Sequence, residues 1–211
     1  MRKETKPMEI PNDHGKRKYA CGFVHIMRGL PGSGKSTIIK EMLADPSRPD
    51  FTPENVAICS ADHYMLDPKT GEYCFRDYMI KKVHTLCYLK FLKLTHTATV
   101  DHIVIDNTNL QHIDFVNYFV AARTFNYDIV LHQLYDSGLT NEQLSERCVH
   151  NIKANGKGSI AAMRKKWERF NIKKLEALIQ IDNVPGTEYV LERCIGIAEP
   201  DSGPKAKTSS T

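Results

Sequence analysis

Short apolar runs alternate along the chain with longer segments of helical periodicity. Runs of four to eight apolar residues that end at polar residues are typical of strands buried on both faces of a sheet. Such strands are expected at 21–28, 56–60, 102–106, 128–135 and 187–195, and helices at 36–43, 78–95, 111–125, 140–150 and 159–181. This alternation predicts an α/β fold, a three-layer sandwich with a mostly parallel sheet between helices.

Four of the predicted helices carry more detailed signals. Ser33 stands where a helix N-cap would precede 36–43, and Thr140 with Gln143 forms a capping box at the next-to-last helix. In 159–181 the 3-4-3 apolar spacing makes Trp167 a core anchor rather than a platform for bases. The apolar face of 111–125 is expected to consist of Ile113, Val116, Phe119, Val120 and Ala122. That of 159–181 is expected to consist of Ile160, Met163, Trp167 and Phe170.

Length and composition indicate one domain with two polar tails. The chain has 211 residues and a net charge of +4. Residues 1–18 and 199–211 are poor in apolar residues, so we expect disorder there, the first as a basic tail, and a folded domain at 19–198. Residues 1–18 contribute +3 and residues 199–211 contribute two charges of each sign, so the domain has 21 basic against 20 acidic residues. Bulk charge is therefore no evidence for nucleic-acid binding.

Membrane insertion and secretion are not expected. No run approaches the roughly 20 apolar residues of a membrane span, and the N-terminus lacks the apolar region of a secretory signal. The six cysteines show no metal-like spacing, which fits a reducing compartment, the cytoplasm or the nucleus. Four of them lie in apolar stretches and are expected to be buried thiols: Cys21, Cys59, Cys87 and Cys194.

The strongest chemical signal is GLPGSGKS at residues 29–36. It matches the phosphate-binding loop pattern G-x-x-x-x-G-K-[ST] and lies between a predicted strand and a predicted helix, the context that this motif requires. Glycines let backbone N–H groups surround a phosphate, Lys35 reaches the β- and γ-phosphates, and Ser36 ligates Mg²⁺. The residues expected to bind ATP are Gly29, Pro31, Gly32, Ser33, Gly34, Lys35, Ser36 and Thr37.

Carboxylates follow the other predicted strands. In parallel α/β sheets ligands bind beyond the carboxyl ends of the strands, so these groups converge on the phosphate loop. Asp62 is the expected general base that deprotonates an acceptor hydroxyl, although an aspartate that caps the next segment is the alternative. Asp106 is expected near Mg²⁺ with Ser36. The polar residues Asn107, Thr108 and Asn109 are expected to hold their loop by local hydrogen bonds.

A basic segment lies late in the chain. Residues 153–174 carry a net charge of +7. A lid could bring Arg147, Lys153 or Lys157 to the phosphates, and the same charge could follow a phosphodiester backbone or form a solvated helix face.

Taken together, GLPGSGKS, SADHY at 60–64, IDNTN at 105–109 and SERCVHNIK at 145–153 resemble the P-loop polynucleotide kinases, in particular the NEDD-four-binding-protein-two-like kinase domain. The resemblance covers about residues 20–170. It implies an ATP-dependent 5′-hydroxyl kinase of DNA or RNA ends, with Lys35, Asp62 and Arg147 as its catalytic residues. Phage-type members carry an acceptor-binding arginine three residues after the base, where this chain has Met65.

Three functions remain open from the sequence. The first is a polynucleotide 5′-kinase with ATP and Mg²⁺ as cofactors. The absence of that arginine motivates the second, a small-metabolite kinase on the same scaffold. The third is a nucleotide-binding interaction module with little turnover.

Overall fold

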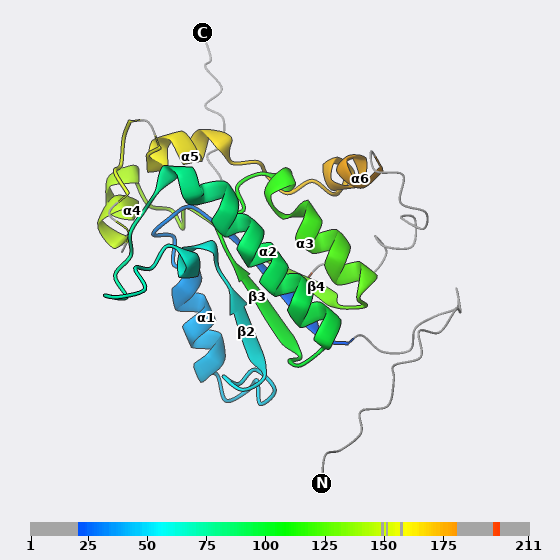
Figure 1. The fold of residues 1–211 in the computed structure, drawn as a ribbon. Coiled ribbons are helices and arrows are strands. Elements are labelled where there is room, and N and C mark those ends of the chain that lie inside the picture. The colour runs from blue at the N-terminus through cyan, green and yellow to red at the C-terminus, as the bar shows by residue number, and fades with distance from the viewer. Residues whose placement is uncertain (1–20, 149, 151, 157, 181–195, 199–211) are drawn as a thin grey trace.

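The computed structural model describes residues 21–148, 150, 152–156, 158–180 and 196–198 (Figure 1). The two predicted tails and the predicted strand at 187–195 lie outside these residues. The described strands are β1 (Phe23–Gly29), β2 (Val56–Cys59), β3 (His102–Asp106), β4 (Asp128–Tyr135) and β5 (Gly196–Ala198). They form one sheet in the order β2-β3-β1-β4-β5, and every pair is parallel.

The helices are α1 (Lys35–Ala44), α2 (Ile80–Thr97), α3 (His112–Thr124), α4 (Asn141–Arg147), α5 (Ile160–Lys166) and α6 (Ile172–Gln180). Two short 3₁₀ helices, Ala61–Tyr64 and Asp77–Met79, lie between β2 and α2. Figure 1 shows α2 and α3 side by side over the sheet, and α4 and α5 together near the carboxyl ends of the strands. The α/β sandwich predicted from the sequence is confirmed.

Side chains of each strand alternate between two apolar layers. Val24 and Ile26 of β1 belong to a core cluster that α2, α3 and α6 cover, whereas Met27 packs with Ile39 and Met42 of α1 on the other face. Successive side chains of a strand point to opposite faces of the sheet, and helices cover both faces here. Both faces of this central strand are therefore buried. Among the described residues no helix is both long enough and apolar enough to cross a membrane.

The expected helix at 159–181 is two helices, α5 and α6, because contacts with α3 take its backbone hydrogen bonds. The amide of Glu168 donates to the carbonyl of Leu110 at 2.9 Å, and the amide of Asn171 donates to Nε2 of His112 at 2.9 Å. The Glu168 carboxylate accepts from the amide of His112 and lies 2.7 Å from its Nδ1. A continuous helix would lose these bonds, so the prediction was wrong for a tertiary reason.

Arg28 of β1 is fully buried and ties this break to the sheet. Its guanidinium donates to the carbonyl oxygens of Asn109, Leu110 and Glu168 at 2.7–3.0 Å. It also lies over the ring of Trp167, 4.5 Å from the centroid. The predicted anchoring role of Trp167 is confirmed, and the Arg28 guanidinium is one of the groups that its ring contacts.

Three local predictions were wrong. Gly34, with φ of 98°, is the N-cap of α1, and the Ser33 hydroxyl is buried without a hydrogen-bond partner among the described residues. Ile113, expected on the buried face of α3, is 59% exposed. Cys21 is exposed because it precedes β1 at the edge of the domain, whereas Cys59 and Cys87 are buried as expected. Cys194 lies outside the described residues.

Candidate active site

The glycine loop joins β1 to α1 at the centre of the sheet. Gly32 and Gly34 have φ of 77° and 98°, which side chains with a Cβ rarely adopt. A Cβ on Gly32 would also lie 2.2 Å from the carbonyl oxygen of Leu144 in α4. Gly32 is therefore required twice, by its own backbone and by the close approach of α4.

Four backbone N–H groups of this loop are open to a ligand. Within the described part of the chain, the amides of Gly32, Gly34, Lys35 and Ser36 have no protein acceptor. They precede or begin a helix of 10 residues, whose N-terminus carries a partial positive charge. This arrangement fits the binding of a phosphate group.

The ammonium group of Lys35 bends back onto its own loop. Its Nζ donates to the carbonyl oxygens of Gly29 and Leu30 at 2.9 and 3.0 Å. Burial lowers the pKa of Lys35, and the nearby carboxylates of Asp106 and Asp62 act against that shift. The cation is thus held beside two carboxylates, with neutral carbonyls as its only direct hydrogen-bond partners among the described residues.

Ser36 and Asp106 form a pair at the first turn of α1. The Ser36 hydroxyl donates to Oδ2 of Asp106 at 3.0 Å. Burial raises the pKa of Asp106, and Lys35 and Ser36 partly offset the rise. A hydroxyl and a carboxylate beside a phosphate-binding loop are the oxygen ligands that suit Mg²⁺. The structure therefore brings together the two residues predicted for the metal.

Asp62 lies in the 3₁₀ helix after β2 and is close enough to Lys35 and Asp106 to influence the pKa of each. Its Oδ2 lies 3.3 Å from Nε2 of His150, and its Oδ1 accepts a hydrogen bond of 3.4 Å from the hydroxyl of Tyr73. The rings of Tyr73 and His150 are in contact, with centroids 3.8 Å apart. Two loops that are distant in sequence therefore meet at the predicted base.

Sequence reasoning did not assign Tyr73 or His150 to the site. Tyr73 lies in none of the motifs, His150 lies in SERCVHNIK without an assigned role, and 77 positions separate the two residues. Burial raises the pKa of Tyr73, and the charge of Asp62 and the hydrogen bond to it raise this pKa further, so the hydroxyl is a donor at neutral pH. Only the fold could show that both side chains converge on Asp62.

The asparagines after β3 hold the strand ends together over long range. Oδ1 of Asn107 accepts from the amide of Ala61, and Nδ2 of Asn109 donates to the carbonyl of Met27. The prediction of local hydrogen bonds was wrong for both asparagines, because their bonds reach β1 and the 3₁₀ helix after β2. They fix the spacing between Asp62, Asp106 and the glycine loop.

The predicted lid cations have different surroundings. Arg147 is an exposed residue at the end of α4, and its side chain has no hydrogen bond or ion pair with the described part of the chain. Lys153 is also exposed, and Lys157 lies outside the described residues. Arg164 of α5 binds the segment between β4 and α4. Its guanidinium pairs with Asp136 and donates to Asn141 and to the carbonyl of Leu139.

Met65, at the position of the arginine expected from phage-type kinases, is only 5% exposed. It packs in the core with Val83 and Cys87. An arginine at this backbone position would have to leave that core, so any acceptor-binding cation must come from another part of the chain.

Comparison with known proteins gives distant matches. The chain is 25% identical over 157 residues to human NEDD4-binding protein 2, and this match covers 74% of the chain but 8% of the relative. It is 26% identical over 176 residues to rat YLP motif-containing protein 1, with 76% and 12% covered. No family model matches.

The chain has an α/β fold in which helices flank a parallel sheet. The sequence match to NEDD4-binding protein 2 confirms the relative that the motifs indicated. Among solved structures, a chain of the Pnkp1/Rnl/Hen1 RNA repair complex aligns with a TM-score of 0.48 and 17% identity, over 78% of this chain and 47% of that one.

Proposed function

We propose that the protein is an ATP-dependent polynucleotide 5′-hydroxyl kinase. The observation that carries the proposal is the placement of Asp62 beside the phosphate-binding loop, close to both Lys35 and Asp106. This edge of the sheet combines groups for a phosphate donor with a carboxylate for the acceptor. The resemblance of the chain to polynucleotide kinase-like proteins supports the choice of a nucleic-acid end as the acceptor.

The residues of the site fit ATP and Mg²⁺. The open amides of Gly32, Gly34, Lys35 and Ser36 would bind phosphate oxygens, and the Lys35 ammonium would exchange its loop carbonyls for the β- and γ-phosphates. The Ser36 hydroxyl and the Asp106 carboxylate would hold Mg²⁺. When bound, the metal neutralises charge on the phosphates.

Asp62 would accept the proton of the acceptor hydroxyl. The acceptor oxygen then bonds to the γ-phosphorus as the bond to the bridging oxygen of ADP breaks. A carboxylate has about four lone-pair positions, and His150 and Tyr73 use two of them. The acceptor can therefore bind Asp62 while both neighbours keep the carboxylate oriented. Arg147 is proposed to reach the phosphates when α4 and the following loop close over the nucleotide.

The burial of Met65 favours a second candidate, a small-metabolite kinase. If no other cation of the site binds a phosphate of the acceptor, we expect an acceptor that carries no phosphate group. The two functions share the donor site and differ only in the acceptor.

Transfer from ATP labelled in its γ-phosphate decides between them. The acceptors are 5′-hydroxyl DNA, 5′-hydroxyl RNA, nucleoside 3′-monophosphates and a panel of hydroxyl metabolites. We expect label on the oligonucleotides. Label on metabolites alone would establish the second function, and ATP binding without ADP release on any acceptor would show a binding module.

A further inference from the structure

A short segment that contacts the proposed acceptor base through Tyr73 carries several exposed apolar side chains, which are called the patch below. Of the large apolar residues that are exposed in the described part of the chain, four lie between residues 66 and 80: Leu66, Phe75, Tyr78 and Ile80. Phe75 is 58% exposed and Tyr78 is 81% exposed. Aromatic rings are usually buried because burial stabilises the fold, so a concentration of exposed rings marks a contact surface.

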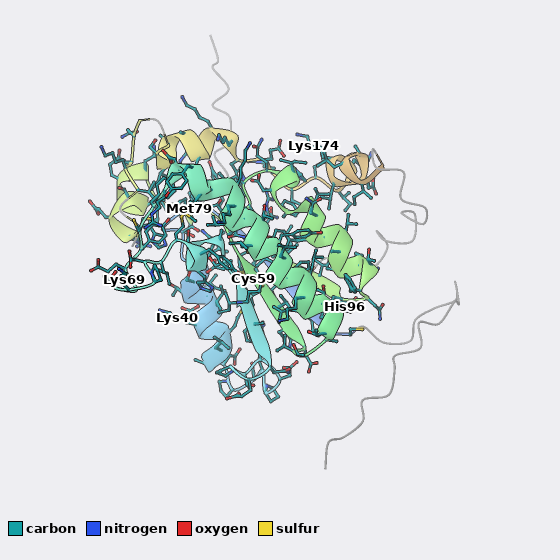
Figure 2. The ribbon with its side chains drawn as sticks, in the orientation of Figure 1. Lys40, Cys59, Lys69, Met79, His96 and Lys174 are labelled. Carbon is teal, nitrogen blue, oxygen red and sulfur yellow. The ribbon has the colours of Figure 1, made fainter. Side chains whose placement is uncertain are left out.

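The segment that carries this patch is anchored to the active site. Residues 65–74 form a hairpin, with a bridge between Leu66 and Tyr73 and a hydrogen bond from the amide of Cys74 to the carbonyl of Met65. Figure 2 labels Lys69 at the outer end of this hairpin and Met79 at the start of α2, on the side where α5 lies.

Tyr73 connects the segment that carries the patch to Asp62. Its hydroxyl donates to Asp62, and its ring contacts His150. Phe75 follows Tyr73 by two residues, so the Cα atoms of the two lie at most about 7 Å apart. An acceptor whose terminal hydroxyl reaches Asp62 would therefore extend past Tyr73 toward Phe75 and Tyr78.

The charges around the rings favour an anion. Residues 75–82 read FRDYMIKK, with three basic residues against one acidic residue, in a domain that is nearly neutral. Lys81 and Lys82 are exposed in the first turn of α2, which contains no acidic residue. Cations at this end of a helix repel its dipole, so this placement does not help the fold and instead creates a positive surface.

We propose that Phe75 and Tyr78 form a stacking platform for the bases of a single-stranded polynucleotide acceptor, with Lys81 and Lys82 beside its backbone. The proposal rests on the proposed function and specifies its substrate class. Exposed aromatic rings interleaved with cations bind single strands with little sequence preference, because every base has a face that can stack. Affinity should then rise with length over the first few nucleotides.

Direct binding tests the platform without turnover. A 5′-hydroxyl DNA decamer with a fluorophore at its 3′ end is titrated with protein, and its anisotropy is measured for wild type, Phe75→Ala, Tyr78→Ala and Ile113→Ala. Ile113 is the matched control, since it is also exposed, at 59%, but lies on α3. Loss of one stacked base raises Kd by about 5- to 150-fold.

We expect that increase for Phe75→Ala and Tyr78→Ala, near wild-type affinity for Ile113→Ala, and recovery in Phe75→Trp. All variants change exposed side chains, and a thermal unfolding scan checks that each is folded. Lys81→Gln should lower the slope of log Kd against log salt concentration by about 0.7.

A wild-type decamer affinity that neither aromatic variant changes would overturn the platform, and so would the absence of decamer binding by the wild-type protein. The failure of the proposed function looks different: the decamer binds and depends on Phe75, but no phosphate is transferred to it.

Discussion

Two polar clusters lie on the same parallel sheet, and they differ in how completely their side chains are bonded. The edge cluster, which consists of Lys35, Ser36, Asp62, Asp106 and His150, lies at the carboxyl ends of the strands. Its members are partly exposed, and among the described residues its Lys35 bonds only to carbonyls of its own loop. The histidine chain, which consists of His132, His25, His102 and Asp50, runs across three strands inside the α1 face.

The histidine chain is continuously hydrogen-bonded. Nε2 of His132 lies 3.1 Å from Nδ1 of His25, Nε2 of His25 lies 3.0 Å from Nδ1 of His102, and Nε2 of His102 lies 3.1 Å from a carboxylate oxygen of Asp50. Asp50 can only accept when ionised, so His102 donates to it. The same logic then sets the tautomers of His25 and His132 along the chain.

The degree of hydrogen bonding separates structural from functional polar groups in this fold. The histidines are buried at 4–8% exposure, and each ring bonds to another member of the chain, so the cluster fixes the pairing of β3, β1 and β4. The edge cluster keeps open donors and acceptors, which stabilise nothing by themselves and are available to a ligand. Four variants or conditions test this distinction.

The largest effect is expected for Asp62→Asn. Loss of the proposed base should lower kcat by about 10²- to 10⁴-fold, while the Kd for ATP stays within about twofold because the glycine loop is unchanged. Isothermal titration with ATP and a transfer assay measure the two quantities. Glu41→Gln, an exposed position of α1, is the control. A variant with wild-type kcat would remove Asp62 from catalysis.

His25→Leu should act on stability instead of activity. It leaves His132 and His102 without their shared partner, which we expect to lower the free energy of unfolding by about 2–4 kcal/mol. Urea unfolding followed by circular dichroism measures this. His84→Ala, an exposed change on α2, should cost much less. The distinction between the clusters fails if His25→Leu unfolds at the wild-type urea concentration.

Acid should weaken the histidine chain before it affects surface carboxylates. Burial lowers the pKa of His25 to about 3 and that of His132 to about 4, well below the ordinary value of 6.5. The unfolded chain therefore binds more protons, and stability present above pH 6.5 is lost as pH falls toward 4.

Urea midpoints measured between pH 7 and pH 4.5 test this, because most carboxylates remain ionised in that window. We expect a steady fall in the wild type and a shallower one in His132→Asn. Equal slopes in both proteins would show that His132 does not carry this pH dependence.

The smallest effect is expected for His150→Gln. Glutamine can still donate to Asp62 but cannot reproduce the ring contact with Tyr73. We predict a fall in kcat/KM of about 3- to 10-fold with a change in unfolding free energy below about 1 kcal/mol. His150→Ala should lower kcat/KM further. If both variants match wild type in the transfer assay, His150 does not orient the base.

Much of the fold was predictable, because the signals were local. Apolar runs placed β1 to β4 within about two residues, and the spacing of GLPGSGKS placed the turn between β1 and α1. The break between α5 and α6 was not predictable. Local periodicity continues through Trp167, but hydrogen bonds from Glu168 and Asn171 to residues around the start of α3 are stronger than helix propensity there.

The glycine loop and the polar residues at the strand ends could be identified from the sequence, since glycine at fixed spacing and strand periodicity are properties of short segments. Which of those residues lie in contact depends on the fold. In the fold Met65 is buried in the core, and Arg164 forms an ion pair with Asp136. Tyr73 and His150 both contact Asp62, whereas Phe75 and Tyr78 are exposed. These outcomes depend on packing between segments that are remote in sequence, where no local pattern carries the information.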